Sequence, residues 1–406
     1  MKPYQYLLLL CLGSALCGVL PGNVCAQTKS VVPTRADNDA NTRKGFDAFY
    51  NLEYDKAIHE FEAAQQAHPN DPFAVNHTLA AVIFKELYRL GALDTEAYAS
   101  DSFLAKKLAA PLDPKVRDRV NQLTEQALAL EQAELQDNPN DVDALYARGS
   151  TRALHATYIG IAEKAWFAAL RSAVAARRDN ERVLELDPNY VDAKVIVGTH
   201  LYIVGSLSWP MKVAASIVGL SGSKQKGLED LRQATASPHT DVASDAKIVL
   251  ALFLRREQKY GEALQVVNSL QNEYPHNFLM ATEYAHLLNA AGHGQDAIAA
   301  YRKVLAGCRS NAYNQCRIEI PAFGLGEALR GQKDYAAAAE AYELAASNGN
   351  DPDLKQRATL AAGQMYDLLQ KRDTAMEKYK AVIAENSTSN SADLARHYMK
   401  QAYKSQ

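Results

Sequence analysis

The stretch GEALRGQKDYAAAAEAY, residues 326–342, decides the fold of this chain. It begins with a glycine, reaches an alanine twelve positions later and ends in a tyrosine four positions after that alanine. Counted on the alanine, successive copies from Ala263 to Ala375 are spaced by 34, 41 and 37 residues. A period of about 34 residues with helical patterning inside each unit predicts stacked helix hairpins. The copies that carry the glycine are Gly45, Ala57 and Phe61; Gly326, Ala338 and Tyr342; and Gly363, Ala375 and Tyr379.

The spacing has a physical reason in the contact between two antiparallel helices. A small residue in the middle of the first helix and another near the start of the second let the two backbones approach closely. The aromatic ring one turn later fills the space beside them. Pro69 and Pro275 each follow the alanine by twelve residues and stop the second helix. Asp71-Pro72 then predicts the start of the next helix, with aspartate as N-cap and proline at the first helical position.

At these residues the chain resembles the tetratricopeptide repeat family. The resemblance covers residues 38–71 and 244–385, whereas residues 114–190 lack the small-residue core and predict longer, irregular helix pairs. It implies an all-α, right-handed superhelical solenoid of helix hairpins with irregular central repeats and a C-terminal capping helix. The alternative is a non-repetitive helical bundle whose alanine-rich helices imitate single copies. The family's unit-ending phrases occur as His68-Pro69-Asn70-Asp71, Asn138-Pro139-Asn140-Asp141 and Asp187-Pro188-Asn189-Tyr190.

Residues 1–26 are typical of a secretory signal peptide, with Lys2 as the positive start and an apolar stretch too short to span a membrane. This pattern predicts a protein of bacterial type that is exported to the periplasm or cell envelope. A lipid-anchored chain is the alternative, which Leu16 before Cys17 and Val24 before Cys25 disfavour. The rest of the chain is predicted to comprise a flexible segment 27–40, an irregular helical array 41–225, a regular array 226–385 and a capping helix 391–405. The two arrays form either one continuous solenoid or two solenoids that meet near residue 225.

Export changes how the last two cysteines are interpreted. Cys308 and Cys316 flank seven residues in the connection that lengthens one interval from 34 to 41 residues. In an oxidising compartment they can pair across that loop. Closing so short a loop contributes about 2–3 kcal/mol on the chain-entropy model. The alternative is two unrelated free thiols.

Composition supports a packed helical protein and excludes several classes of function. Hydrophobic residues make up 48% of the chain and charged residues 22%, which is enough for a core. The net charge of −3 argues against a general binder of nucleic acid or of anionic membranes. The ten histidines form no metal-binding or nucleophile–base spacing that we recognise. The sequence therefore predicts no enzyme activity, no metal and no cofactor.

The tetratricopeptide resemblance implies that the first helix of each unit lines a concave groove for a protein or peptide partner. Positions three before and one or four after the small residue are expected to point into that groove. The side chains there are aromatic, amide and charged, and an ordinary solvated face is the alternative. The partner-binding residues registered in this way are Thr282, His286, Asn289, Phe323, Glu327, Arg330 and Gln364.

A second candidate surface is basic. Residues 148–182 contain more arginine and lysine than acidic residues, with Trp166 and Phe167 among them. Such a surface suits an acidic partner segment or a terminal carboxylate. The alternative is a solvated face with ion pairs along the helices. The proposed anionic-partner patch consists of Arg148, Arg152, Arg171 and Arg178.

Residues 201–220 are unusually apolar, with Lys212 as their one charge. Pro210 and the serines before it forbid one continuous membrane helix, so two apolar half-helices joined at Trp209 are expected. We interpret them as a hairpin buried against neighbouring repeats. The alternative is a contact surface for lipid or a partner, with Trp209 at its end.

These features predict an exported scaffold for protein–protein interaction, set in cell-envelope assembly or organisation. The alternative function is a membrane-surface adaptor that contacts lipid around Trp209 without spanning the bilayer.

Overall fold

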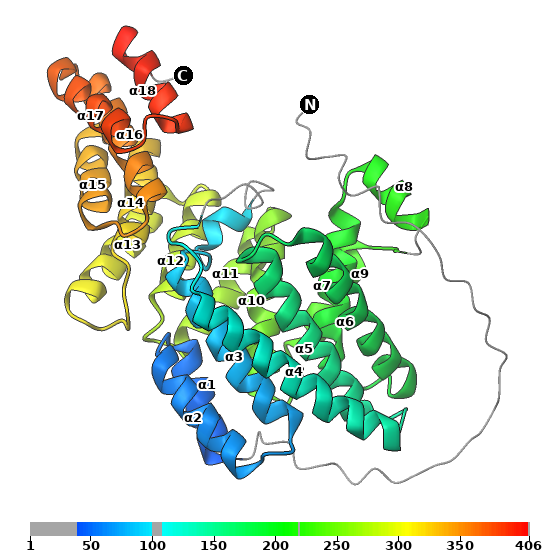
Figure 1. Ribbon diagram of the computed structural model, residues 1–406. Helices are drawn as coiled ribbons and strands as arrows, with labels where there is room; N and C mark the ends of the chain where they lie inside the picture. The colour runs from blue at the N-terminus through cyan, green and yellow to red at the C-terminus, as the bar shows by residue number, and fades with distance from the viewer. Residues whose placement is uncertain (1–38, 100–107, 218–219, 405–406) are drawn as a thin grey trace.

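The computed structural model describes residues 39–99, 108–217 and 220–404, and every regular element in these ranges is a helix (Figure 1). The predicted signal peptide and residues 27–38 of the expected flexible segment lie outside the described residues. Consecutive helices pack as antiparallel hairpins that stack along the chain. The elements are α1 (Ala40–Tyr50), α2 (Tyr54–Ala67), α3 (Pro72–Arg89), the 3-10 helix η4 (Thr95–Ala99), α4 (Pro114–Asp137), α5 (Val142–Ile161), α6 (Trp166–Leu186), α7 (Ala193–Ser206), α8 (Trp209–Ile217), α9 (Lys224–Ala234), α10 (Thr240–Arg256), α11 (Tyr260–Glu273), α12 (Phe278–Ala290), α13 (Gly294–Arg309), α14 (Glu319–Gly331), α15 (Tyr335–Asn348), α16 (Pro352–Leu368), α17 (Arg372–Glu385) and α18 (Asn390–Lys400).

The glycine–aromatic contact predicted from the spacing forms in each glycine-bearing copy. A Cβ atom built on Gly326 would lie 2.6 Å from the ring of Tyr342. A Cβ atom built on Gly363 would lie 2.7 Å from the ring of Tyr379. Because carbon atoms do not approach so closely, the ring packs directly on the glycine backbone. The first copy repeats the contact between Gly45 and Phe61, at 2.4 Å.

The central helix pairs are irregular, as the sequence predicted. Helices α4, α5 and α6 have 24, 20 and 21 residues, whereas α11, α15 and α17 have 14 each. Helix α7 pairs with α9, across residue 225, because Gly198 and Gly227 allow close approach. A Cβ atom on Gly198 would lie 2.9 Å from the carbonyl oxygen of Gly227. The short helix α8 is left outside this hairpin.

The buried hairpin expected at residues 201–220 is present in α7 and absent in α8. Tyr202 on α7 is buried and stacks on Phe253 of α10, with ring centroids 3.8 Å apart. Trp209, at the start of α8, is 77% exposed. Helix α8 begins after the turn at Leu207, and its Lys212 and Val213 are exposed as well.

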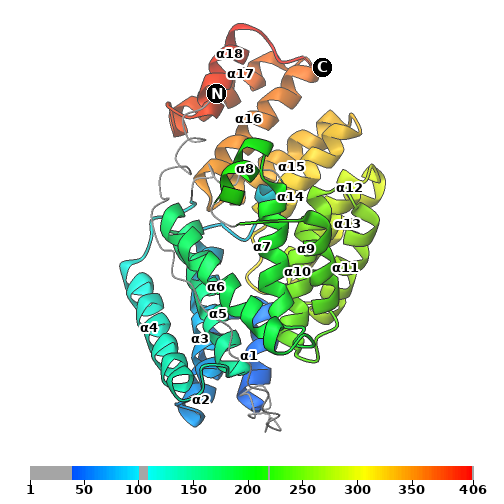
Figure 2. The same ribbon diagram turned by 90° about the vertical axis from the view of Figure 1, so that its right-hand side faces the viewer.

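The first helices of the chain pack against helices that follow about two hundred residues later. The ring of Tyr50 at the end of α1 stacks on Tyr274, with centroids 4.7 Å apart. The Asn277 side-chain amide donates to the carbonyl oxygen of Tyr50 at 2.6 Å, and that of Asn314 to the carbonyl of Asn51 at 3.0 Å. The solenoid is therefore closed onto itself, and blue α1 lies beside α10 and α11 in both views (Figures 1 and 2).

Helix α18 covers the last hairpin. Its Ala392 and Ala395 are fully buried, and the Arg372 guanidinium donates to the carbonyl oxygens of its last turn. The helix ends at Lys400, whereas the expected cap ran to residue 405. The chain then turns back, and the backbone amide of Tyr403 donates to the carboxylate of Asp367 at 2.8 Å.

Candidate partner-binding face

Helices α10, α12, α14 and α16 are the first helices of their units and form one wall of the solenoid. We call this wall the concave face. In the part built by α10 and α12, it holds a segment of the chain itself, η4, from the connection between α3 and α4. Thr95 of η4 donates a hydrogen bond to Glu283 of α12, and Arg255 of α10 forms an ion pair with Glu96 of η4. The concave face thus binds a short polypeptide segment through side chains of two successive units.

The ion pairs under η4 form one connected cluster. Arg255 donates from its second nitrogen to Glu283 at 2.9 Å, and Nδ1 of His286 lies 3.4 Å from Glu283 and 3.9 Å from Glu96. Burial alone would lower the pKa of His286, but its hydrogen bond with Glu283 and the charge of Glu96 raise that pKa above its usual value. Burial would raise the pKa of Glu96, yet the charges of His286 and Arg255 lower it. The cluster therefore favours a carboxylate on the bound segment.

Two of the predicted groove residues are buried rather than on an open surface, and one of them, His286, lies beneath η4. Thr282 is buried and donates to the carbonyl oxygen of Phe278 in its own helix, at 2.7 Å. His286 is buried by η4 above it and by the ring of Tyr301 beside it. Both residues lie on the first helix of their unit, but neither is open to a partner. Asn289, at the end of the same helix, is half-buried.

The remaining predicted residues lie on α14 and α16 and are half-buried. Glu327 accepts a hydrogen bond from the Tyr342 hydroxyl at 2.6 Å and pairs with Arg330 at 2.5 Å. The guanidinium carbon of Arg357 lies over the ring of Phe323, 4.8 Å from the ring centroid. These contacts hold a charged and aromatic surface on the part of the concave face that η4 leaves open. Gln364 lies on α16, the other helix of this part.

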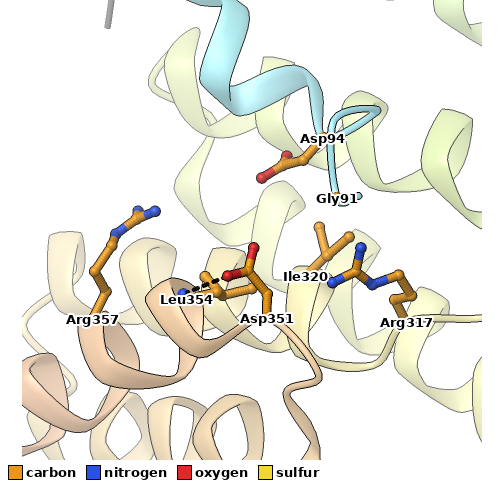
Figure 3. Close-up of a pocket in the computed structure, with 7 residues that line it drawn as sticks. All are labelled: Gly91, Asp94, Arg317, Ile320, Asp351, Leu354 and Arg357. Carbon is orange, nitrogen blue, oxygen red and sulfur yellow. Dashed lines mark hydrogen bonds between the residues drawn. The ribbon is translucent and has the colours of Figure 1, made fainter. Parts of the chain in front are cut away.

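A small pocket, open to solvent, separates the loop before η4 from α14 and α16 (Figure 3). Asp351 at its floor caps α16 by accepting from the backbone amides of Asp353 and Leu354, at 2.9 and 3.2 Å. Arg357 and Arg317 stand on opposite sides of Asp351, and Asp94 faces it from above. The remaining lining residues are Gly91, Ile320 and Leu354.

The predicted arginine patch divides into two parts. Arg148 and Arg152 both pair with Asp179, at 2.7 and 2.5 Å, and that carboxylate is buried. Arg171 and Arg178 are exposed on the outer side of α6, and no ion pair involves either of them in the described ranges. Only the second pair is thus available to an anion.

Cys308 and Cys316 form a disulfide, with their Cα atoms 5.6 Å apart. The bridge closes the loop after α13, and that loop reaches the first hairpin through Asn314. Within the described ranges, no group of histidine, cysteine or acidic side chains is arranged to hold a metal ion. None of the helices described here combines the length and apolar character needed to cross a bilayer.

The sequence did not point to Glu96, Arg255 or Glu283. Glu96 follows a helix and lies in a long connection without any periodic pattern. Arg255 and Glu283 are two charged residues among many on helix faces. Their partners are 159 and 188 residues away in the chain, so no local spacing connects them.

The hairpin contacts define the architecture. The chain has a tetratricopeptide-type solenoid fold. No family model and no curated protein matches it. Similar solved structures include the APC/C hetero-tetramer Cut9–Hcn1 (12% identity, TM-score 0.48, 92% of this chain) and yeast Tom70 (13%, 0.41, 89% of this chain and 87% of that one). A tetratricopeptide repeat protein from Parabacteroides merdae has 14% identity and a TM-score of 0.34 over 80% of this chain and 98% of its own. The chain spans 57% of the Cut9–Hcn1 chain that it matches.

Proposed function

We propose that this protein is a non-enzymatic scaffold whose concave face binds a peptide segment of a protein partner. One observation carries the proposal: the same face already holds residues 94–99 of the chain through Arg255 and Glu283. Stacked helices keep such a wall in place before a ligand arrives, so binding costs little ordering of the receptor. The open part on α14 and α16 extends the face beyond η4.

A partner segment that uses Arg255 has to compete with η4. The competitor is tethered, and a short tether gives a millimolar effective concentration. A ligand for this part of the face therefore needs a carboxylate placed like that of Glu96, and it binds more tightly once η4 is released.

A labelled synthetic peptide of residues 92–99 tests the proposal. We expect it to bind the full-length double variant Thr95→Val, Glu96→Gln about tenfold or more tightly than the wild-type chain, whose face is occupied in cis. A peptide carrying the same two changes is the matched control and should bind neither protein. Equal binding to both proteins, or to none, would show that the face does not recognise such segments.

We also propose that the protein is exported and acts in the periplasm or cell envelope, in envelope assembly or organisation. Support comes from the composition of residues 1–26 alone. N-terminal sequencing of the protein from its native source checks this, because cleavage is expected before Gln27. A mature chain that still begins at Met1 would argue against export by this signal.

A second candidate function is that of a membrane-surface adaptor. The observation that favours it is the exposure of Trp209 on α8, which no repeat covers. Liposome flotation of the wild-type chain and of Trp209→Ala tests this function. The wild-type chain is expected to float and the variant to stay with the soluble fraction.

A further inference from the structure

The large apolar side chains that are exposed gather at one end of the molecule. Of seven such side chains in the described ranges, six belong to α6, α7 and α8, and the seventh is Leu394 on α18. The six are Trp166, Phe167, Leu170, Ile203, Trp209 and Val213. We call the surface formed by these residues the α6–α8 tip.

The helices bring these residues together from two separate parts of the sequence. Arg177 of α6 contacts His200 of α7, with nitrogen atoms 3.0 Å apart, and the two helices run antiparallel. Leu170 lies two turns before Arg177, and Leu207 lies two turns after His200, so the start of α6 and the end of α7 lie side by side. Helix α8 leaves from that end and projects from the stack (Figures 1 and 2).

Basic side chains flank the tip. Phe167, Arg171 and Arg178 are spaced by four and seven residues and share one face of α6. Lys212 is exposed on α8, one turn after Trp209, and Lys164 lies 5.4 Å over the ring of Trp166.

The acidic groups around the tip are largely engaged elsewhere. Asp179 pairs with Arg148 and Arg152, Glu181 with Arg177, and Glu257 with Lys224. Glu163, in the turn before α6, is half-buried. A chain whose net charge is −3 thus presents a positive, aromatic surface at this one end.

We propose that the α6–α8 tip binds the surface of an anionic phospholipid bilayer, an inference that rests on the second candidate function. Exposed tryptophan and aliphatic side chains suit the boundary between headgroups and acyl chains. Arg171, Arg178 and Lys212 lie beside them, where lipid phosphates would be met. Each such basic residue strengthens binding to an anionic surface about fivefold, so the three together contribute about a hundredfold.

The chain carries its own reporter for this contact. Trp166 and Trp209 are its only tryptophans, and both belong to the tip. Intrinsic tryptophan fluorescence of the full-length protein therefore reports on the tip alone. We expect a blue shift on adding vesicles of phosphatidylcholine and phosphatidylglycerol in equal parts, and no shift with phosphatidylcholine alone.

Flotation with the same two vesicles separates the contributions. Two combined variants should each lower binding to the anionic vesicles. The apolar variant carries Trp209→Ala and Val213→Ala. The basic variant carries Arg171→Gln, Arg178→Gln and Lys212→Gln, and its binding should fall about a hundredfold. Leu394→Ala is the control, because it removes an apolar side chain that is as exposed as Val213 but lies on α18, outside the tip, and its binding should equal that of wild type. Circular dichroism confirms that each variant keeps its helices.

The outcomes distinguish the two levels of the proposal. If the protein binds neither kind of vesicle, both the membrane-surface function and this inference are wrong. Equal binding to neutral and anionic vesicles leaves the adaptor function standing and overturns the assignment of anionic lipid. Concentration-dependent dimerisation that Trp209→Ala abolishes would assign the tip to a second copy of the chain and overturn both.

Discussion

Glu131 on α4 is fully buried where α3, α4 and α5 meet. One of its oxygens accepts a hydrogen bond from Thr151 at 2.5 Å, and the other has no partner within the described ranges. Burial raises the pKa of Glu131 from 4.5 to about 7. The folded protein therefore prefers the protonated acid, whereas the unfolded chain ionises it at lower pH.

We predict that Glu131→Gln removes most of a pH-dependent loss of stability. In the wild type, the protonated Glu131 is accepted by the folded state, and the stability that goes with it is fully present below pH 4.5 and is lost as pH rises through about 7. The loss amounts to about 3 kcal/mol. Urea unfolding at pH 5 and pH 8 should therefore favour the variant over wild type only at the higher pH. Glu125→Gln, exposed on the same helix, is the control and should change neither value.

At the scale of elements, each hairpin whose first helix carries the glycine depends on a glycine backbone that accepts an aromatic ring. The ring of Tyr342 covers Gly326 in the middle of α14, whereas Gly331 at the end of that helix has no neighbour near its missing side chain. Two glycines of one helix thus meet different surroundings. The spacing of the sequence identifies the first as a contact residue, because its partner lies only sixteen positions away.

Gly326→Ala should destabilise the protein by about 2 kcal/mol, since the new methyl group would lie 2.6 Å from the Tyr342 ring and force the helices apart. Gly331→Ala should be neutral or stabilising by up to about 1 kcal/mol, because alanine favours the helix. Thermal unfolding of both variants checks the pair. Equal destabilisation by the two substitutions would mean that close packing on Gly326 is not what holds this hairpin.

At the scale of the whole molecule, the solenoid is closed rather than open. The Tyr50 hydroxyl donates to the carboxylate of Asp245 at 2.7 Å and to the carbonyl of Asp241 at 2.9 Å, both on α10. Open repeat arrays transmit stability only between neighbours. These contacts connect the first hairpin to the middle of the C-terminal array, so a change in α1 is felt far along the chain.

Tyr50→Ala should therefore lower hydrogen-exchange protection in α10 and α11 as well as in α1. The substitution removes the stacking on Tyr274 and the hydrogen bond to Asp245, and the lost hydrogen bond alone costs about 1 kcal/mol. Tyr398→Ala on α18 is the matched control, and its effect should remain within α16 to α18. If α10 and α11 stayed as protected as in wild type, the closure would be too weak to couple the two regions.

The candidate site could be predicted only in part. The first helices of the units form the concave wall, and Phe323, Glu327, Arg330 and Gln364 lie half-buried on it. Thr282 and His286 have the expected register but are covered. The cover of His286 comes from η4, whose contacts to Arg255 and Glu283 join residues far apart in the chain.

The sequence by itself determined the helix hairpins and their order, because the small residue and the aromatic ring that it contacts recur within a single unit. Only the tertiary structure decided that α1 meets α10 and α11, that η4 fills part of the concave face and that Trp166 joins Trp209 at one tip. Those contacts follow from small rotations summed over many units. The repeat pattern in the sequence does not specify the total rotation between distant units, so the contacts between those units are known only from the tertiary structure.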